Sequence, residues 1–229
     1  MSIFSSSEVC PVNVSCVLFD LDGTVLDTLA DLRNGVNYAL RLFSFPEISL
    51  EDTRRFLGNG ARQLISLSVP AGTPPEVTEQ VLAAYVPYYQ AHCRIETAPY
   101  PGIPELIAAL RQRGVKVGIV SNKPDAAVQE LSALFFPSQL DVSIGESPAV
   151  RRKPAPDTVF AALRALGRED ASSCVYVGDT EVDIETARSA GMPCISVSYG
   201  FRTEEELRAS GAETLARSVS ELSGLLLGA

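Results

Sequence analysis

The sequence of 229 residues predicts an α/β fold built on a parallel sheet, with a helical segment inserted into it. Two observations predict the sheet: short, continuously apolar runs recur along the chain, and amphipathic stretches of about a dozen residues separate them. Parallel strands are typically buried on both faces, and a helix usually connects one to the next. A third observation predicts the insertion, because about ninety residues after the first apolar run contain no convincing strand.

Five apolar runs are the predicted strands of the sheet. They cover residues 16–21, 115–120, 141–145, 174–178 and 193–198. Four amphipathic stretches have apolar residues at spacings near three and four, which predicts helices over 103–114, 124–135, 155–167 and 181–191. Three of these helices have a glycine at a plausible C-cap, namely Gly114, Gly167 and Gly191. Strands that alternate with helices of this length indicate a doubly wound sheet.

The insertion is predicted to be entirely helical. A first helix over 28–43 places its apolar residues on one face, at Leu29, Leu32, Val36, Leu40 and Phe43. Ser49 and Asp52 have the spacing of a capping box for a second helix. Further helices are expected over 60–69 and 75–92, the latter kinked at Pro87. We therefore expect a helical cap at residues 25–95, an α/β core at 16–24 and 96–229, and a mobile leader at 1–15.

Composition excludes several classes of function. The 28 acidic residues outnumber the 19 basic ones, and a formal charge of −9 disfavours a nucleic-acid partner. No apolar run approaches the roughly 18 residues of a membrane span. Five scattered cysteines without a CxxC pair predict reduced thiols in a cytoplasmic protein, and a single histidine, His92, excludes mechanisms with two imidazoles. We expect a small-molecule ligand and a monomer or homodimer.

Polar residues follow the predicted strands where a doubly wound sheet binds its ligands, beyond the carboxyl ends of the strands. These residues are Asp20, Asp22, Thr24, Ser121, Asn122, Asp179 and Asp183. Lys153 stands before the helix that follows the third predicted strand. Four separate chain segments should therefore bring the four aspartates, Ser121 and Lys153 to one crevice.

The residue types in this cluster indicate phosphoryl chemistry. Several carboxylates at one edge would repel one another unless a cation bound there, and oxygen ligands without histidine or thiolate favour Mg²⁺. A carboxylate beside Mg²⁺ can attack phosphorus, and a second carboxylate can act as general acid and base. Ser121 and Asn122 could hold the phosphoryl oxygens, while Lys153 neutralises their charge.

Four motifs in this order resemble those of the haloacid dehalogenase-like hydrolases. They are FDLDGTVLDT at 19–28, SN at 121–122, KPAPD at 153–157 and GDTEVD at 178–183. The resemblance implies a Rossmann-like core with a helical cap, Asp20 as nucleophile, Asp22 as general acid and base, and Lys153 as the charge-balancing residue. It further implies phosphoryl contacts by Thr24, Ser121 and Asn122. The implied Mg²⁺ ligands are Asp20, the carbonyl oxygen of Asp22, Asp179 and Asp183.

Within that family the chain is most similar to the phosphoglycolate phosphatases. The similarity rests on GNGAR at 58–62, YPG at 100–102, SNKP at 121–124 and YGF at 199–201. It implies substrate contacts by Asn59, Gly60 and Arg62, and hydrolysis of 2-phosphoglycolate to glycolate and phosphate through an aspartyl-phosphate. A phosphomutase or a sugar-phosphate phosphatase of the same fold is the alternative. A signalling receiver phosphorylated on aspartate is a further alternative, although a receiver would be a shorter chain without a cap.

Overall fold

A parallel sheet of six strands forms the centre of the computed structural model, which describes residues 14–168 and 171–228. The sheet order is β5-β4-β1-β6-β7-β8. The strands are β1 (Cys16–Phe19), β4 (Lys116–Pro124), β5 (Val142–Glu146), β6 (Cys174–Gly178), β7 (Cys194–Val197) and β8 (Thr214–Ala216). Each of the five predicted strands is present, and the edge strand β8 is an addition. Because β1 lies between β4 and β6, the ends of these three strands meet at the centre of one sheet edge.

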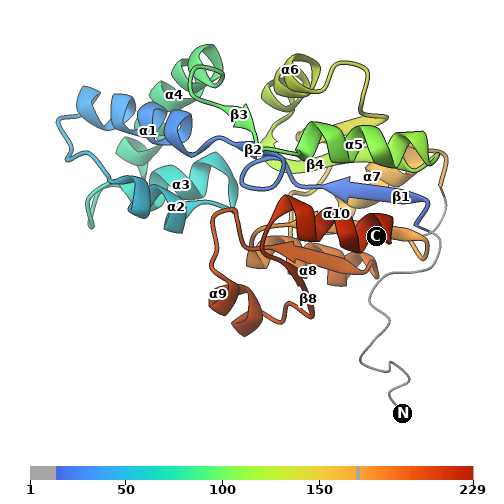
Figure 1. Cartoon of the computed structure of the whole chain (residues 1–229). Helices are drawn as coiled ribbons and strands as arrows, with labels where there is room; N and C mark the ends of the chain where they lie inside the picture. Colours follow the sequence, from blue (N-terminus) through green and yellow to red (C-terminus); the bar gives the residue numbers. More distant parts are fainter. Residues whose placement is uncertain (1–13, 169–170, 229) are drawn as a thin grey trace.

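Helices cover both faces of the sheet (Figure 1). They are α5 (Ile103–Gln112), α6 (Asp125–Phe135), α7 (Asp157–Ala165), α8 (Glu181–Ala190), α9 (Glu204–Ala209) and α10 (Val219–Leu227). Alternate residues of β1 point into the two layers. Val17 and Phe19 belong to the core shared with α5, α6 and α10, whereas Cys16 and Leu18 pack with α7 and α8. This arrangement confirms the predicted doubly wound α/β fold.

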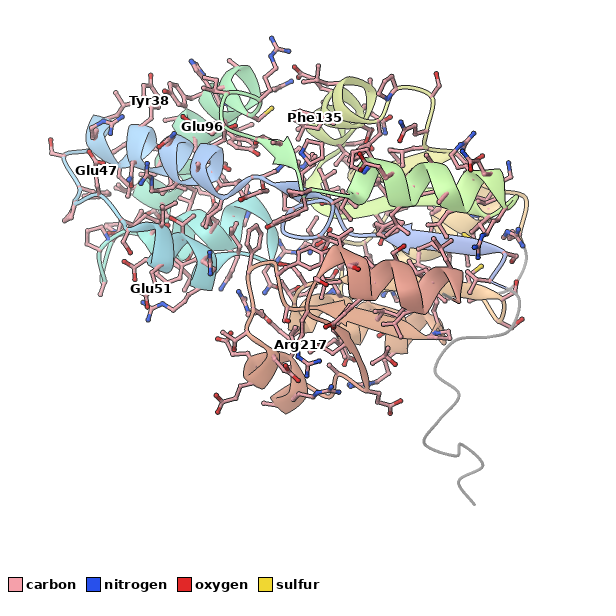
Figure 2. All side chains as sticks on the ribbon, in the orientation of Figure 1. Tyr38, Glu47, Glu51, Glu96, Phe135 and Arg217 are labelled. Carbon is pink, nitrogen blue, oxygen red and sulfur yellow. The ribbon has the colours of Figure 1, made fainter. Side chains whose placement is uncertain are left out.

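The inserted segment is helical, as predicted. It contains α1 (Leu29–Leu42), α2 (Leu50–Phe56), α3 (Gly60–Ser68) and α4 (Pro75–His92). These helices form a lobe beside the sheet (Figure 1). Three residues of this lobe, Tyr38, Glu47 and Glu51, are labelled in Figure 2. Two short strands, β2 (Leu26–Asp27) and β3 (Ala98–Pro99), pair antiparallel where the chain enters and leaves the lobe. The domain boundaries at residues 25 and 95 stay a prediction.

Local sequence signals explain several helix ends. The predicted capping box begins α2, where the Asp52 backbone N–H donates to the Ser49 hydroxyl oxygen at 3.0 Å. Gly191 ends α8 in the left-handed conformation with φ of 67°, which glycine adopts without steric cost. Helix α4 continues through Pro87 to His92.

The remaining predictions concern the chain start and the cysteines. Residues 1–13 of the predicted leader, with Cys10, lie outside the described residues. Ser15 joins the sheet, since its backbone N–H donates to the Ser173 carbonyl at 2.8 Å. The four cysteines in the described part of the chain, Cys16, Cys93, Cys174 and Cys194, form no disulfide there. Within the same residues, no helix combines the length and apolarity needed to cross a membrane.

Candidate active site

Asp20 and Asp22 lie directly beyond the C-terminal end of β1. The Asp20 backbone N–H donates to the Val177 carbonyl at 2.8 Å, which extends the pairing between β1 and β6 by one residue. Gly23 follows with φ of 80°, and any side chain at this position would overlap the Asp179 carboxylate. The turn after β1 is therefore packed directly against the end of β6.

Lys153 connects two of the carboxylates. Its ammonium Nζ lies 2.8 Å from Asp20 Oδ1 and 2.7 Å from Asp183 Oδ1, and it donates to the Tyr176 hydroxyl at 3.2 Å. The side chain is only 2% exposed. Burial opposes its positive charge, but Asp183 and Asp20 outweigh this effect and hold the pKa of Lys153 well above its usual range. Lys153 is therefore a charged ammonium in the middle of the cluster.

Three buried carboxylates form one acidic cluster around this lysine. Single oxygens of Asp20, Asp179 and Asp183 all lie within 4.8 Å of one another. Burial, followed by the charge of Asp183, raises the pKa of Asp20 to about 7. Burial together with the charges of Asp183 and Asp20 raises the pKa of Asp179 as well. One ammonium does not balance three carboxylates, and the all-oxygen donor set fits a hard divalent cation.

Hydrogen bonds fix Asp179 to two other loops and Asp183 to its own loop. Asp179 Oδ2 accepts the Phe201 backbone N–H at 2.7 Å, and Asp179 Oδ1 accepts the Thr24 hydroxyl at 3.3 Å. Asp183 Oδ2 accepts the backbone N–H and the hydroxyl of Thr180, at 3.1 and 2.7 Å, in the capping box of α8. Asp183 therefore caps α8 and also belongs to the acidic cluster.

Asp22 has a different environment from Asp20. Lys123 Nζ lies 2.8 Å from both of its carboxylate oxygens, and the Thr28 hydroxyl donates to Asp22 Oδ1 at 2.7 Å. Lys123 also lies over the Tyr89 ring, 4.7 Å from the centroid. Asp22 therefore interacts with a cation of its own, at the point where the chain enters the helical lobe.

Ser121 and Asn122 stand at the end of β4, on the other side of β1. The Ser121 hydroxyl oxygen accepts the Lys123 backbone N–H at 3.2 Å. Asn122 Nδ2 donates to the Lys153 carbonyl at 3.0 Å, and Asn122 Oδ1 accepts the Lys153 N–H at 2.8 Å. This reciprocal pair fixes the backbone of Lys153 and thereby aims its ammonium at Asp20.

A cavity of about 70 Å³ lies between this site and the helical lobe. The sheet side of its lining includes Asp20, Asp22, Ser121, Asn122, Lys123 and Lys153. The lobe contributes Leu57, Gly58, Gly60, Leu64, Tyr85 and Tyr89. Charged groups therefore line one side of the cavity and mostly apolar groups the other, which suits a small anionic ligand.

The three residues predicted to bind substrate from the lobe are placed differently. Gly60 lines the cavity, next to the Asn122 carbonyl. Asn59 precedes α3 and accepts a hydrogen bond from Arg152 through its carbonyl at 3.2 Å. Arg62 is 61% exposed and forms an ion pair with Glu79 of α4. Neither Asn59 nor Arg62 is part of the cavity lining, so their contacts with substrate stay predictions.

Sequence reasoning overlooked three groups at this site. Lys123 directly follows SN at 121–122, and its partner Asp22 is 101 residues away in sequence. The Tyr176 hydroxyl, inside an apolar strand, donates to Asp183 Oδ1 at 3.1 Å. Arg202 follows the YGF segment and contacts α2 and Glu181. No local pattern distinguishes Lys123 and Arg202, because they bind Asp22 and Arg54, which are distant in the chain.

Comparison with known proteins assigns the family. The profile of the haloacid dehalogenase-like hydrolases matches residues 17–197. The chain belongs to this family. The family match and the geometry agree, since all four motifs that resemble the family meet at the acidic cluster.

Similar proteins of the haloacid dehalogenase-like family are phosphatases. Phosphoglycolate phosphatase of Caulobacter vibrioides is 34% identical, over 93% of this chain and 90% of its own length. N-acetylmuramic acid 6-phosphate phosphatase of Pseudomonas aeruginosa is 31% identical, over 94% of this chain and 96% of its own. A crystal structure from Lactobacillus delbrueckii subsp. bulgaricus, provisionally assigned as a phosphoglycolate phosphatase, has a TM-score of 0.90 at 37% identity, covering 95% of this chain and 100% of that one. The chain is accordingly a phosphoric monoester hydrolase of this family.

Proposed function

We propose that the protein is a Mg²⁺-dependent phosphatase that hydrolyses a small phosphate monoester through a phosphorylated Asp20. The observation that carries the proposal is the pairing of Asp20 and Asp22 in one turn, each with its own lysine. Asp20 contacts Lys153 inside the acidic cluster, and Asp22 contacts Lys123 at the cavity. Two carboxylates two residues apart thus occupy different electrostatic environments, as separate nucleophile and acid–base roles require.

The acidic cluster would hold the metal ion. Asp20, Asp179 and Asp183 supply the carboxylate oxygens. The raised pKa values of Asp20 and Asp179 indicate that full ionisation of the three carboxyl groups is unfavourable without a cation. Mg²⁺ bound there would keep these carboxylates ionised and neutralise negative charge on the phosphoryl group.

The first chemical step would use Asp20 and Asp22 together. A carboxylate oxygen of Asp20 attacks phosphorus, and the bond from phosphorus to the ester oxygen breaks. The departing oxygen takes a proton from Asp22, so the alcohol leaves neutral. Lys153, Ser121 and Asn122 would stabilise the charge on the equatorial oxygens.

The second step would restore the enzyme. Asp22, now ionised, accepts a proton from a water molecule, whose oxygen attacks the phosphorus of the acyl phosphate. The bond between phosphorus and Asp20 breaks, phosphate departs and Asp22 is again protonated.

We propose 2-phosphoglycolate as the preferred substrate. The cavity of about 70 Å³ suits a compact ester, and several similar proteins are phosphoglycolate phosphatases. A phosphatase for a larger sugar phosphate is the second candidate, supported by the similarity to the N-acetylmuramic acid 6-phosphate enzyme. The two candidates share the chemistry at Asp20 and differ in what the lobe must accommodate.

Phosphate release from a panel of small esters, with Mg²⁺ or with EDTA, tests the proposal. We expect release that needs Mg²⁺ and falls at least about a thousandfold in Asp20→Asn, since loss of a nucleophile leaves only residual catalysis. Mass spectrometry of acid-quenched wild-type enzyme should find phosphate on the Asp20 peptide. Asp141→Asn, altered at the opposite end of the sheet, is the matched control and should keep its activity. Full activity of Asp20→Asn, or of the wild type in EDTA, would refute the mechanism.

A further inference from the structure

Arg202 connects the loop after β7 to the helical lobe. Its Nη1 donates to the Arg54 carbonyl and its Nη2 to the Leu57 carbonyl, both at 2.9 Å. The same guanidinium binds the Glu181 carboxylate through two nitrogens, at 2.9 and 3.1 Å. The side chain is only 11% exposed. One arginine thus holds the end of α2 against the start of α8.

Other donors from the sheet side bind the same stretch of the lobe. Asn122 Nδ2 donates to the Gly58 carbonyl at 3.2 Å, and Arg152 donates to the Asn59 carbonyl at 3.2 Å. Four carbonyls between residues 54 and 59 therefore accept hydrogen bonds from three separate segments of the α/β core. Arg202 contributes two of these bonds and is not itself part of the cavity lining.

The stretch that Arg202 holds lies over the cavity. Leu57 and Gly58 line it opposite Asp20 and Asp22. Phe201, the neighbour of Arg202, also lines the cavity and donates its N–H to Asp179. The position of residues 54–58 relative to the acidic cluster consequently depends on the segment from Phe201 to Arg202.

We propose that Arg202 is a positioning residue that limits the size of the phosphate ester the enzyme accepts. By fixing residues 54–58 over the cavity, it keeps the distance between the lobe and the acidic cluster short enough for a compact ester only. This inference rests on the proposed phosphatase function and adds a determinant of substrate choice. A planar guanidinium can bind two carbonyls and a carboxylate at once, which an ammonium cannot do in the same geometry.

The test compares two esters in variants of Arg202. We expect Arg202→Gln to lower kcat/KM for 2-phosphoglycolate and to maintain or raise it for glucose 6-phosphate, so that the selectivity ratio falls at least about tenfold. The change should lie mainly in KM, because Arg202 touches no reacting group. Arg202→Lys and Glu181→Gln should shift the ratio in the same direction. Arg188→Gln, which removes an exposed ion pair with Glu185 on the same helix, is the control and should leave the ratio unchanged.

Amide hydrogen exchange supplies a second measurement that does not depend on activity. We expect faster exchange at residues 54–60 in Arg202→Gln than in wild type, with α5 and α7 unchanged. Equal losses for both esters, or unchanged exchange at residues 54–60, would refute the role of Arg202. A wild-type enzyme that hydrolyses no phosphate ester would instead refute the proposed function, and hydrogen exchange would still decide whether Arg202 fixes the lobe.

Discussion

Replacing Lys153 by methionine tests whether its ammonium compensates the acidic cluster. The ammonium is 2.8 Å from Asp20 and 2.7 Å from Asp183. Loss of one partner from a buried ion pair typically costs about 3–5 kcal/mol. The pKa of Asp20 is already raised to about 7, so this carboxyl can take up a proton in the variant. The expected loss of stability therefore lies at the lower end of this range, at about 3 kcal/mol. Phosphate release should fall about a hundredfold to a thousandfold, as expected when a group that stabilises developing charge is lost.

Urea denaturation at pH 7 in EDTA measures the stability loss, and phosphate release with Mg²⁺ measures the activity. Lys116→Met is the matched control, because Lys116 pairs with Asp141 but is 49% exposed. An exposed pair contributes about 0.2–1 kcal/mol, and its loss should leave activity unchanged. The reasoning fails if Lys153→Met loses no more stability than Lys116→Met, or if it retains activity within tenfold of wild type.

Two further predictions concern stability. Partial burial raises the pKa of Asp141, but hydrogen bonds from Lys116 and the Val117 amide, with the charge of Arg111, outweigh it and hold this pKa below its usual value of 3.8. The contribution of Asp141 is therefore present above about pH 4 and is lost as the pH falls through the lowered pKa. Asp141→Asn should lose about 1–2 kcal/mol at pH 7, and this difference from wild type should shrink towards pH 3 in urea denaturation. Tyr89→Phe should gain about 1 kcal/mol in urea denaturation, because the buried Tyr89 hydroxyl has no hydrogen-bond partner in the described part of the chain; a loss of stability would contradict this assignment.

The sequence predicts the central fold well because its signals are local. Continuous apolar runs mark β1, β4, β5, β6 and β7, since strands buried on both faces exclude polar residues. Strand β8 was missed because Thr214–Ala216 is short and lies at the sheet edge, where burial imposes no such pattern. Strands β2 and β3 have two residues each, which is too short for any periodicity.

The grouping of the candidate site residues could be predicted where a motif follows a strand. Asp20, Asp179 and Lys153 could be brought together because topology alone places strand ends at one edge. The contact of Lys123 with Tyr89 and the contacts of Arg202 with the lobe could not be predicted, because they depend on how closely the lobe approaches the sheet. That approach is a property of tertiary packing and cannot be inferred from the spacing of residues in the sequence.

The sheet order also determines when the acidic cluster can form during folding. β1 pairs with β6, whose residues follow it by about 160 positions, so Asp20 meets Asp179 and Asp183 only after a very long loop has closed. Contacts of such high sequence separation slow folding, and here the closing step also brings mutually repelling carboxylates together. A cation bound to the cluster would stabilise an interaction that the unfolded chain and early folding species lack. Its influence would therefore fall mainly on the unfolding rate, so that the ion prolongs the lifetime of the native state.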